Sequence, residues 1–310
     1  MSALLSIQDV SKRYGQHIAL QNINLEVQQG HVFGLLGPNG AGKTSLIRII
    51  NQITAPDQGR VIFKGDTLRP EHIAHIGYLP EERGLYKKMK VGEQCVYLAQ
   101  LKGLSKQEAI KRLTYWFEKF DIMAWWNKTI EDLSKGMAQK VQFITTILHE
   151  PELLILDEPF SGFDPINAAL IQEEMLRLKS LGATIILSTH DMGSVEELCD
   201  EIGLIHQSHL ILCGPVKSVK EQFKQHLFEI EYVGTAMELG ISLGHQFELM
   251  DHHVLDGFNK AKIKINGGLK LNDLLRAVMQ NNEVVSAREL VPNMNEIFIQ
   301  AVTAKQLSHE

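Results

Sequence analysis

A glycine-rich segment near the start of the chain has the residue types and spacing of a loop that binds phosphate. Residues 37–44 fit the pattern G-x-x-x-x-G-K-[ST]. Glycines let the backbone turn its N–H groups toward a phosphate, where a Cβ would be in the way. Lys43 can bridge β- and γ-oxygens, and the Thr44 hydroxyl can ligate Mg²⁺. The predicted phosphate site consists of Gly37, Pro38, Asn39, Gly40, Ala41, Gly42, Lys43, Thr44 and Ser45.

Two consecutive carboxylates follow an apolar run later in the chain. Asp157 and Glu158 come directly after the predicted strand at residues 153–156. Asp157 can hold a magnesium ion, and Glu158 can orient and deprotonate an attacking water molecule. Two carboxylates after a strand usually mean no more than a solvated loop. In a chain that also carries a phosphate loop, they predict the second half of a nucleotide site.

A histidine ends a further apolar run. Residues 184–188 predict a strand, and His190 follows it by two residues. Ligands of open parallel sheets bind at the carboxyl ends of the strands, so His190 is predicted to reach the γ-phosphate region.

The elements that must position these residues alternate between strands and helices. Residues 32–36 predict a buried strand before the phosphate loop, and residues 46–50 predict a helix after it. The apolar runs at 153–156 and 183–187 flank a helical pattern at 168–181, which gives a strand–helix–strand unit. The fold class predicted for residues 1 to about 214 is therefore α/β.

Two other regions depart from this pattern. Strand signals vanish from about residue 92 to 140, where a helical subdomain is predicted; its aromatic residues, which include all three tryptophans, form either its core or a partner-binding face. After Pro215, alternating apolar residues at 228–232 and 262–265 predict half-buried strands, and residues 271–278 predict a helix. This second region is predicted to be a small α+β domain.

Composition excludes several classes of protein. The 310 residues are 44% hydrophobic and 22% charged, with a formal net charge of −6. This balance argues against wholesale disorder and gives no electrostatic signal for nucleic-acid binding. Because no apolar run is long enough to span a bilayer and no secretory leader is visible, the chain is expected to be neither secreted nor membrane-spanning.

One more motif completes a family pattern. Leu133-Ser134-Lys135-Gly136-Met137 precedes Asp157, and the ordered set resembles the ATP-binding cassette (ABC) ATPases. The resemblance implies a P-loop NTPase cassette at residues 1–217, with a mainly parallel sheet, antiparallel N-terminal strands and a helical subdomain at about 88–145. Residues 218–310 would form a C-terminal α+β accessory domain.

The resemblance also implies how the site works. Two cassettes, expected to be a homodimer, would pair head to tail with ATP and Mg²⁺ between them. Glu158, His190 and Lys43 would be catalytic, and Thr44, Glu81 and Asp157 would hold the metal. Further nucleotide contacts would come from Tyr14, which stacks on adenine, from Ser134, Lys135 and Gly136 on the partner's γ-phosphate, and from Asp164 in the loop that crosses the interface.

The sequence departs from the usual family pattern in two motifs, at three positions. Glu81 stands where the family usually has Gln, so it adds negative charge beside the phosphates. Lys135 and Met137 replace a Gly and a Gln of the commoner signature, whereas Ser134 and Gly136 are kept. Since Asp157, Glu158 and His190 are present, these departures indicate a subfamily variant with activity.

Residues 78–86, the Lys-Gly-Met ending and residues 295–299 resemble the sodium-efflux (Nat-type) branch of ABC exporters. The predicted function is the ATP-hydrolysing motor of an exporter, peripheral on the cytoplasmic face of the membrane. It would drive separately encoded membrane permease subunits through a region near Glu81, Arg83 and Tyr86, and no nucleic-acid partner is expected. The alternative is a soluble, non-transport ABC ATPase that acts on nucleic acid or ribosomes. A third possibility is that the C-terminal domain senses a small ligand.

Overall fold

In the computed structural model, which describes residues 2–82, 84–255 and 258–307, the chain divides into two units. The first contains the residues up to 216 together with those from 298 onward, and the second contains residues 217–297. Helix α10 (Met294–Leu307) starts in the second unit and continues into the first. The accessory domain at 218–310 stays a prediction.

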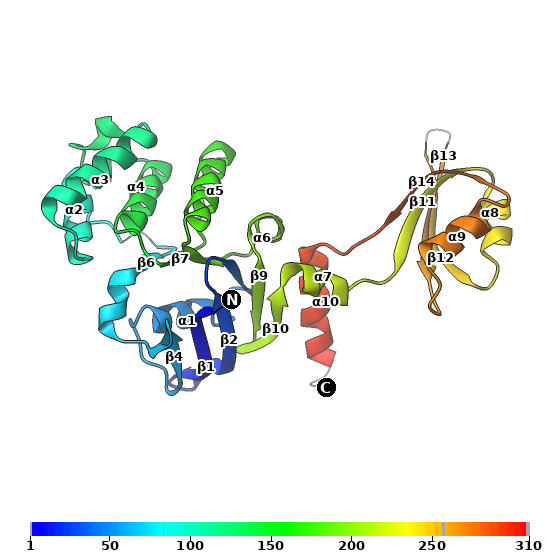
Figure 1. The fold of residues 1–310 in the computed structure, drawn as a ribbon, viewed down its shortest axis with the longest axis horizontal. Helices are drawn as coiled ribbons and strands as arrows, with labels where there is room; N and C mark the ends of the chain where they lie inside the picture. Colours follow the sequence, from blue (N-terminus) through cyan, green and yellow to red (C-terminus); the bar gives the residue numbers. More distant parts are fainter. Residues whose placement is uncertain (1, 83, 256–257, 308–310) are drawn as a thin grey trace. The chain divides into compact units, whose positions relative to one another are not determined.

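A six-stranded sheet forms the centre of the first unit (Figure 1). Its order is β10-β9-β3-β8-β7-β6, and every neighbouring pair is parallel except β9 and β10. The buried runs that predicted strands are β3, β7 and β8, and these predictions are confirmed. The strands are β3 (Val32–Leu36), β6 (Ile76–Leu79), β7 (Leu153–Asp157), β8 (Thr184–Ser188), β9 (Glu201–His206) and β10 (His209–Pro215).

An antiparallel sheet built mostly from the N-terminal residues packs beside the central sheet. Its order is β2-β1-β4-β5, with a tight turn that pairs Tyr14 with His17. Apolar residues of both sheets and of helix α1 share one buried cluster, so the α/β architecture with antiparallel N-terminal strands is confirmed. The elements are β1 (Ala3–Tyr14), β2 (His17–Gln28), β4 (Gln58–Phe63), β5 (Asp66–Thr67) and α1 (Lys43–Ile50).

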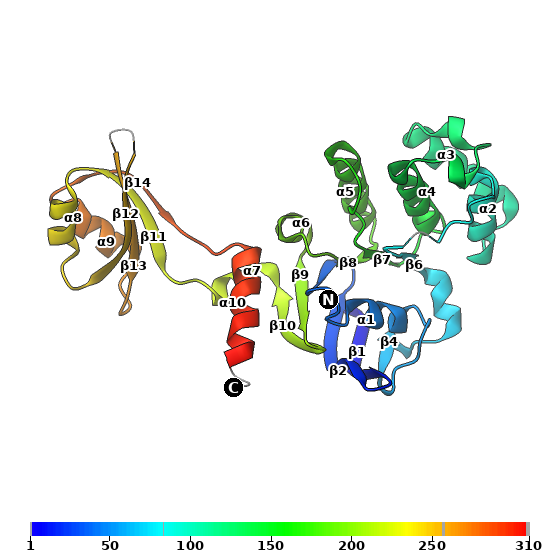
Figure 2. The same ribbon diagram turned by 180° about the vertical axis from the view of Figure 1, so that it is seen from behind.

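A helical subdomain is inserted between β6 and β7. In Figures 1 and 2 its helices α2, α3 and α4 group together apart from the two sheets. Trp116 is buried, and the ring of Trp126 packs edge-on against Phe117 and leaves no room for a Cβ at Gly92. Its helices are α2 (Val91–Leu101), α3 (Lys106–Lys119) and α4 (Lys135–Ile147), with short 3₁₀ turns at Met123–Trp125 and Ile130–Asp132.

Two further helices of the first unit follow strands of the central sheet, α5 (Pro165–Ser180) after β7 and α6 (Met192–Leu198) after β8, and the 3₁₀ helix Pro70–His75 precedes β6. The predicted helix at 168–181 is α5, which begins earlier because Asp164 caps it and Pro165 occupies its first turn. Helix α7 (Val216–Gln222) follows β10, and all of it after its first residue belongs to the second unit.

The second unit has the element order β-α-β-β-α-β. Its antiparallel sheet has the order β12-β13-β11-β14, and the alternating residues Phe228, Ile230 and Tyr232 of β11 lie in its core. Leu274 and Val278 of α9 pack into the same core. The elements are β11 (Leu227–Val233), α8 (Ala236–Leu243), β12 (Phe247–Leu255), β13 (Phe258–Ile265), α9 (Leu271–Val278) and β14 (Glu283–Glu289).

Within the described residues, no helix has the length and apolar character needed to cross a membrane.

Candidate nucleotide site

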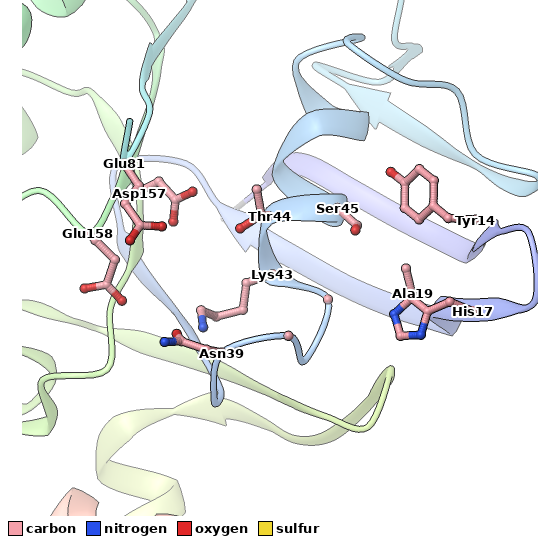
Figure 3. Close-up of a pocket in the computed structure, with 12 residues that line it drawn as sticks. Tyr14, His17, Ala19, Asn39, Lys43, Thr44, Ser45, Glu81, Asp157 and Glu158 are labelled. Atoms are coloured by element: carbon pink, nitrogen blue, oxygen red, sulfur yellow. The ribbon is translucent and has the colours of Figure 1, made fainter. Parts of the chain in front are cut away.

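A cavity of about 280 Å³ lies where β3, β6 and β7 end, at the carboxyl edge of the central sheet (Figure 3). Such edges are where open α/β sheets bind their ligands. The phosphate loop, the loop after β6 and the end of β7 all contribute side chains to it. The cavity is lined by Tyr14, His17, Ala19, Asn39, Gly40, Gly42, Lys43, Thr44, Ser45, Glu81, Asp157 and Glu158.

Backbone geometry explains the glycines of the phosphate loop. Gly37, Gly40 and Gly42 have φ values of 146°, 79° and 119°, a region that residues with a side chain rarely adopt. A Cβ on Gly42 would also lie 2.3 Å from the carbonyl oxygen of Ala19. Helix α1 starts directly after Gly42 with no side-chain cap and no acid in its first turn. Its free N–H groups and dipole therefore favour an anion at this end.

Lys43 is buried within the loop that it would use to bind phosphate. Its Nζ donates hydrogen bonds to the carbonyl oxygens of Gly37 at 2.7 Å and Pro38 at 3.2 Å. Burial lowers the pKa of Lys43, while the charges of Glu158, Asp157 and Glu81 act in the opposite direction. Three predicted loop residues, Gly37, Pro38 and Ala41, do not line the cavity. Ala41 is buried, and its N–H donates to the carbonyl oxygen of Pro38.

Three carboxylates gather opposite the loop. Figure 3 shows Glu81, Asp157 and Glu158 on the side of the cavity that faces Thr44 and Lys43. Asp157 is 3% exposed, and burial raises its pKa, with the charges of Glu81 and Glu158 adding to the effect. Of the three, only Asp157 is buried, whereas Glu81 is exposed. Like charges this close are stabilised by a cation placed among them.

Glu158 and His190 form a pair at the edge of the cavity. His190 Nδ1 lies 2.8 Å from Glu158 Oε1, although the two residues follow different strands. The Glu158 side chain is 11% exposed and that of His190 is 71% exposed. Glu158 also has a φ of 49°, and such backbone strain in a residue with a side chain often marks a functional site.

The other end of the cavity contains the aromatic ring that was assigned to adenine. Tyr14 is 44% exposed and lines the cavity, and Lys12 Nζ lies 5.5 Å from its ring centroid. His17 and Ala19 line the same end, and sequence reasoning missed both. The signal that could have revealed His17 is the tight turn after Tyr14, which returns the next strand to the same place.

Besides the loop residues named above and His190, four more residues of the predicted site do not line this cavity. Ser134 caps α4 and accepts a hydrogen bond from the Met137 N–H at 3.3 Å, with Lys135 and Gly136 in the first turn. Asp164 caps α5 and accepts from the Asn167 N–H at 3.0 Å. Helix α4 belongs to the helical subdomain, and helix α5 follows β7 of the central sheet. These residues contribute nothing to the cavity of their own chain.

The side-chain oxygen atoms of the cavity suit Mg²⁺ only together with the phosphates of a bound nucleotide. In the part of the chain that is described, no group of three or more His, Cys, Asp or Glu residues is arranged to hold a metal ion. Magnesium, however, is usually held by one or two carboxylates plus the phosphates of a substrate. The Thr44 hydroxyl with Asp157 and Glu81 fits that partial set.

The fold and this cavity define a phosphate-loop nucleotide-binding protein. Residues 20–161 match the family model described as "ABC transporter", and residues 214–302 match "ATP-binding protein DrrA1-3-like, C-terminal domain". The chain belongs to the family of ABC transporter ATP-binding proteins, whose cassette binds ATP and acts as an ATPase. The predicted family and enzyme class are confirmed.

Named relatives extend over much of the chain. It is 40% identical over 302 residues to "Uncharacterized ABC transporter ATP-binding protein YhaQ" of Bacillus subtilis, covering 97% of this chain and 99% of the relative. Identity is 31% over 284 residues to the "Bacitracin transport ATP-binding protein BcrA" of Bacillus licheniformis (88% and 90% covered). It is 33% over 226 residues to the "ABC transporter ATP-binding protein NatA" of Bacillus subtilis (70% and 92% covered).

Among solved structures, a chain described as "Structure of ATP binding subunit of ABC transporter" is similar to the first unit. The two chains are 33% identical with a TM-score of 0.67, and the match covers 71% of this chain and 93% of the solved chain. The solved structure therefore supports the cassette fold for the part of the chain that it covers.

Proposed function

We propose that this chain is the ATP-hydrolysing motor of an ABC exporter, and that two copies hydrolyse MgATP between them to drive separately encoded permease subunits. The observation that carries the proposal is the single cavity to which the phosphate loop, Asp157 and Glu158 all contribute. Export is supported by relatives whose names specify bacitracin and lantibiotic transport, Nod factor export and linearmycin resistance. As a partner of permeases, the chain would lie against the inner face of the membrane.

Each side chain of the cavity has a role in this proposal. Lys43 and the N-terminus of α1 would bind the phosphates, which would replace the loop carbonyls that now accept from Lys43. Thr44, Asp157 and Glu81 would hold Mg²⁺, which neutralises phosphate charge when bound. The ring of Tyr14 would stack on the adenine base.

Glu158 is proposed as the general base. Its carboxylate faces the phosphate loop and can accept a proton from a water molecule. His190, whose Nδ1 lies 2.8 Å from Oε1, would hold that carboxylate in place near the γ-phosphate. A buried carboxylate with one positioned partner is suited to this role because few other groups compete for its oxygens.

The remaining assigned residues would act in the partner copy. The first turn of α4, with Ser134, Lys135 and Gly136, would face the other copy's γ-phosphate, and the loop before Asp164 would cross the interface. A homodimer satisfies this arrangement because each copy supplies one of each surface. Permease contact is proposed near Glu81 and Tyr86, of which Tyr86 is 59% exposed; Arg83, assigned to the same region, lies outside the described residues.

The substitution Glu158→Gln tests the proposal. It keeps the size and one oxygen of the side chain but removes the base, so steady ATP hydrolysis should fall by at least about a hundredfold while ATP still binds. An ATP-bound dimer should then accumulate and elute early in size-exclusion chromatography. Glu26→Gln, the same change at an exposed position of β2, is the control and should leave turnover unchanged. Turnover that survives in Glu158→Gln would reject the base assignment.

A further inference from the structure

The segment that follows Glu158 leads away from the central sheet. It runs through the loop at residues 161–164, which we call the 161–164 loop, into helix α5 and back to β8. The loop begins three residues after Glu158, so a shift of the loop can move the Glu158 carboxylate. The contacts that hold this segment in place therefore affect the geometry of the site.

A charged cluster around one buried carboxylate holds α5 to helix α3 of the helical subdomain. The side chain of Glu174 on α5 is 4% exposed and accepts hydrogen bonds from Lys119 on α3 and from Arg177 one turn later on α5, the latter at 2.6 Å. Both cations lie over the ring of Trp116 on α3, at 5.1 and 5.6 Å from its centroid. One carboxylate, two cations and one aromatic ring thus join the two helices.

The cluster is more than a surface ion pair. A carboxylate this deeply buried is stable only with its partners. Lys119 and Arg177 are 32% and 39% exposed, so their contacts with the aromatic ring add a smaller stabilisation. The cluster lies at the wall of a cavity of about 640 Å³ between α3 and α5, lined by Tyr115, Trp116, Arg177, Leu178 and Leu181 among others. The charged cluster therefore joins α3 and α5 beside a cavity that separates the two helices.

A second link holds the other end of the segment to helix α4. Gln139 Nε2 donates a hydrogen bond to the carbonyl oxygen of Ser161. The end of the Lys135 side chain lies against Gly162, where a Cβ would be 2.5 Å from Lys135 Cε. Gly162 has a φ of 83°, so the loop turns there under the first turn of α4. Both views of the fold show α5 beside α4 (Figures 1 and 2).

We propose that Lys119, Glu174 and Gln139 are positioning residues, which fix the 161–164 loop and α5 to the helical subdomain so that this subdomain sets the geometry around Glu158. The inference rests on the proposed function, in which Glu158 is the base. Movement of α3 or α4 is then transmitted to the catalytic carboxylate through side chains that touch no nucleotide in their own copy. The Ser161 N–H donates to the Glu158 carbonyl oxygen at 3.1 Å, so the loop contacts this residue directly, while the Glu158 N–H donates to the carbonyl oxygen of Ser188 of β8 at 2.9 Å.

The test is steady-state ATP hydrolysis by full-length variants. Lys119→Met removes the bond between the helices while Arg177 still pairs with Glu174, so folding should be retained. We expect kcat to fall about tenfold, because a small displacement of a catalytic group is costly, with KM for ATP within about twofold of the wild type. Lys119→Arg should restore kcat, since it keeps a cation over Trp116. Glu173→Gln, the exposed neighbour of Glu174, is the matched control.

A double-mutant cycle separates this mechanism from general destabilisation. Lys119→Met and Gln139→Ala change links at opposite ends of one segment, and their effects on kcat should be less than additive if both act by positioning that segment. A Lys119→Met protein that melts earlier but hydrolyses ATP at the wild-type kcat would overturn the proposal, as would strictly additive effects. Failure of the proposed function is separate: it would show as undiminished turnover in Glu158→Gln.

Discussion

At the level of single residues, the site has more negative than positive charge. Glu81, Asp157 and Glu158 face one buried lysine, and the pKa of Asp157 is raised by its burial and by the other two carboxylates. Lys43 is meanwhile hydrogen-bonded to carbonyl oxygens of its own loop. The arrangement is therefore balanced only when a cation joins the carboxylates and a phosphate takes the place of the loop carbonyls.

Glu81 gives a prediction at this scale, because an amide at this position is common in the family that the sequence resembles. Glu81→Gln removes one negative charge near the proposed ion, so half-maximal activity should need about fivefold more Mg²⁺, the equivalent of about 1 kcal/mol. Titration of ATPase activity with Mg²⁺ measures the change. Glu82→Gln, the exposed adjacent residue, is the control. An unchanged Mg²⁺ midpoint in Glu81→Gln would remove this residue from the metal site.

At the level of elements, local pattern predicted the parts that are buried on all sides. The runs of β3, β7 and β8 are fully buried, so each is apolar without interruption and can be identified from sequence. Glu174 could not be identified in this way. A glutamate on a helix predicts an exposed position. Its burial is explained by Arg177 together with Lys119, which is distant in sequence.

The site was predictable to a similar degree. The phosphate loop and the acids after β7 have local patterns, whereas the assignment of Tyr14 came from family resemblance, and Ala19 has no local signal at all. Helix α10 shows the same limit: its residues from 298 onward belong to the first unit, although they follow the second in sequence. Contacts between segments that are distant in sequence determine these positions. Such contacts cannot be read from the local periodicity of the sequence.

A partly buried histidine at the junction between α4 and β7 predicts a pH effect. His149 Nε2 lies 3.3 Å from the Ile76 carbonyl, and burial, aided by the charge of Lys102, lowers its pKa to about 4. The folded protein thus keeps His149 neutral, while the unfolded chain takes up a proton below its ordinary pKa of about 6.5. Stability should therefore fall as pH drops through the range between these two values.

The variant His149→Gln isolates this effect. The wild type should lose about 2 kcal/mol more than the variant between pH 7 and pH 5, because only the wild type has this proton to gain on unfolding. Urea unfolding of the first unit at both pH values measures the difference. Equal losses in the two proteins would show that His149 does not contribute to acid sensitivity.

At the level of the whole molecule, the chain leaves the first unit at residue 217 and returns to it at residue 298. The second unit has its own core, in which apolar residues of strands β11 and β13 pack against helices α8 and α9. The residues after it nevertheless belong to the cassette. A truncation before the second unit therefore removes two things at once, and its effects cannot be assigned to the accessory unit alone.

Two stop positions separate these contributions. A chain that ends after Ile297 keeps the residues of the second unit but lacks those from 298 onward, whereas a chain that ends after Val216 lacks both. Because residues 298–307 cluster with the cassette, their loss should lower its melting temperature by about 3 °C in both truncated chains, the expected effect of about 1 kcal/mol in a unit of this size. Calorimetry of all three chains, with and without MgATP, gives the comparison. If the chain ending after Ile297 melts like the full chain and only the shorter one is destabilised, the stabilisation comes from the second unit and the returning helix is dispensable.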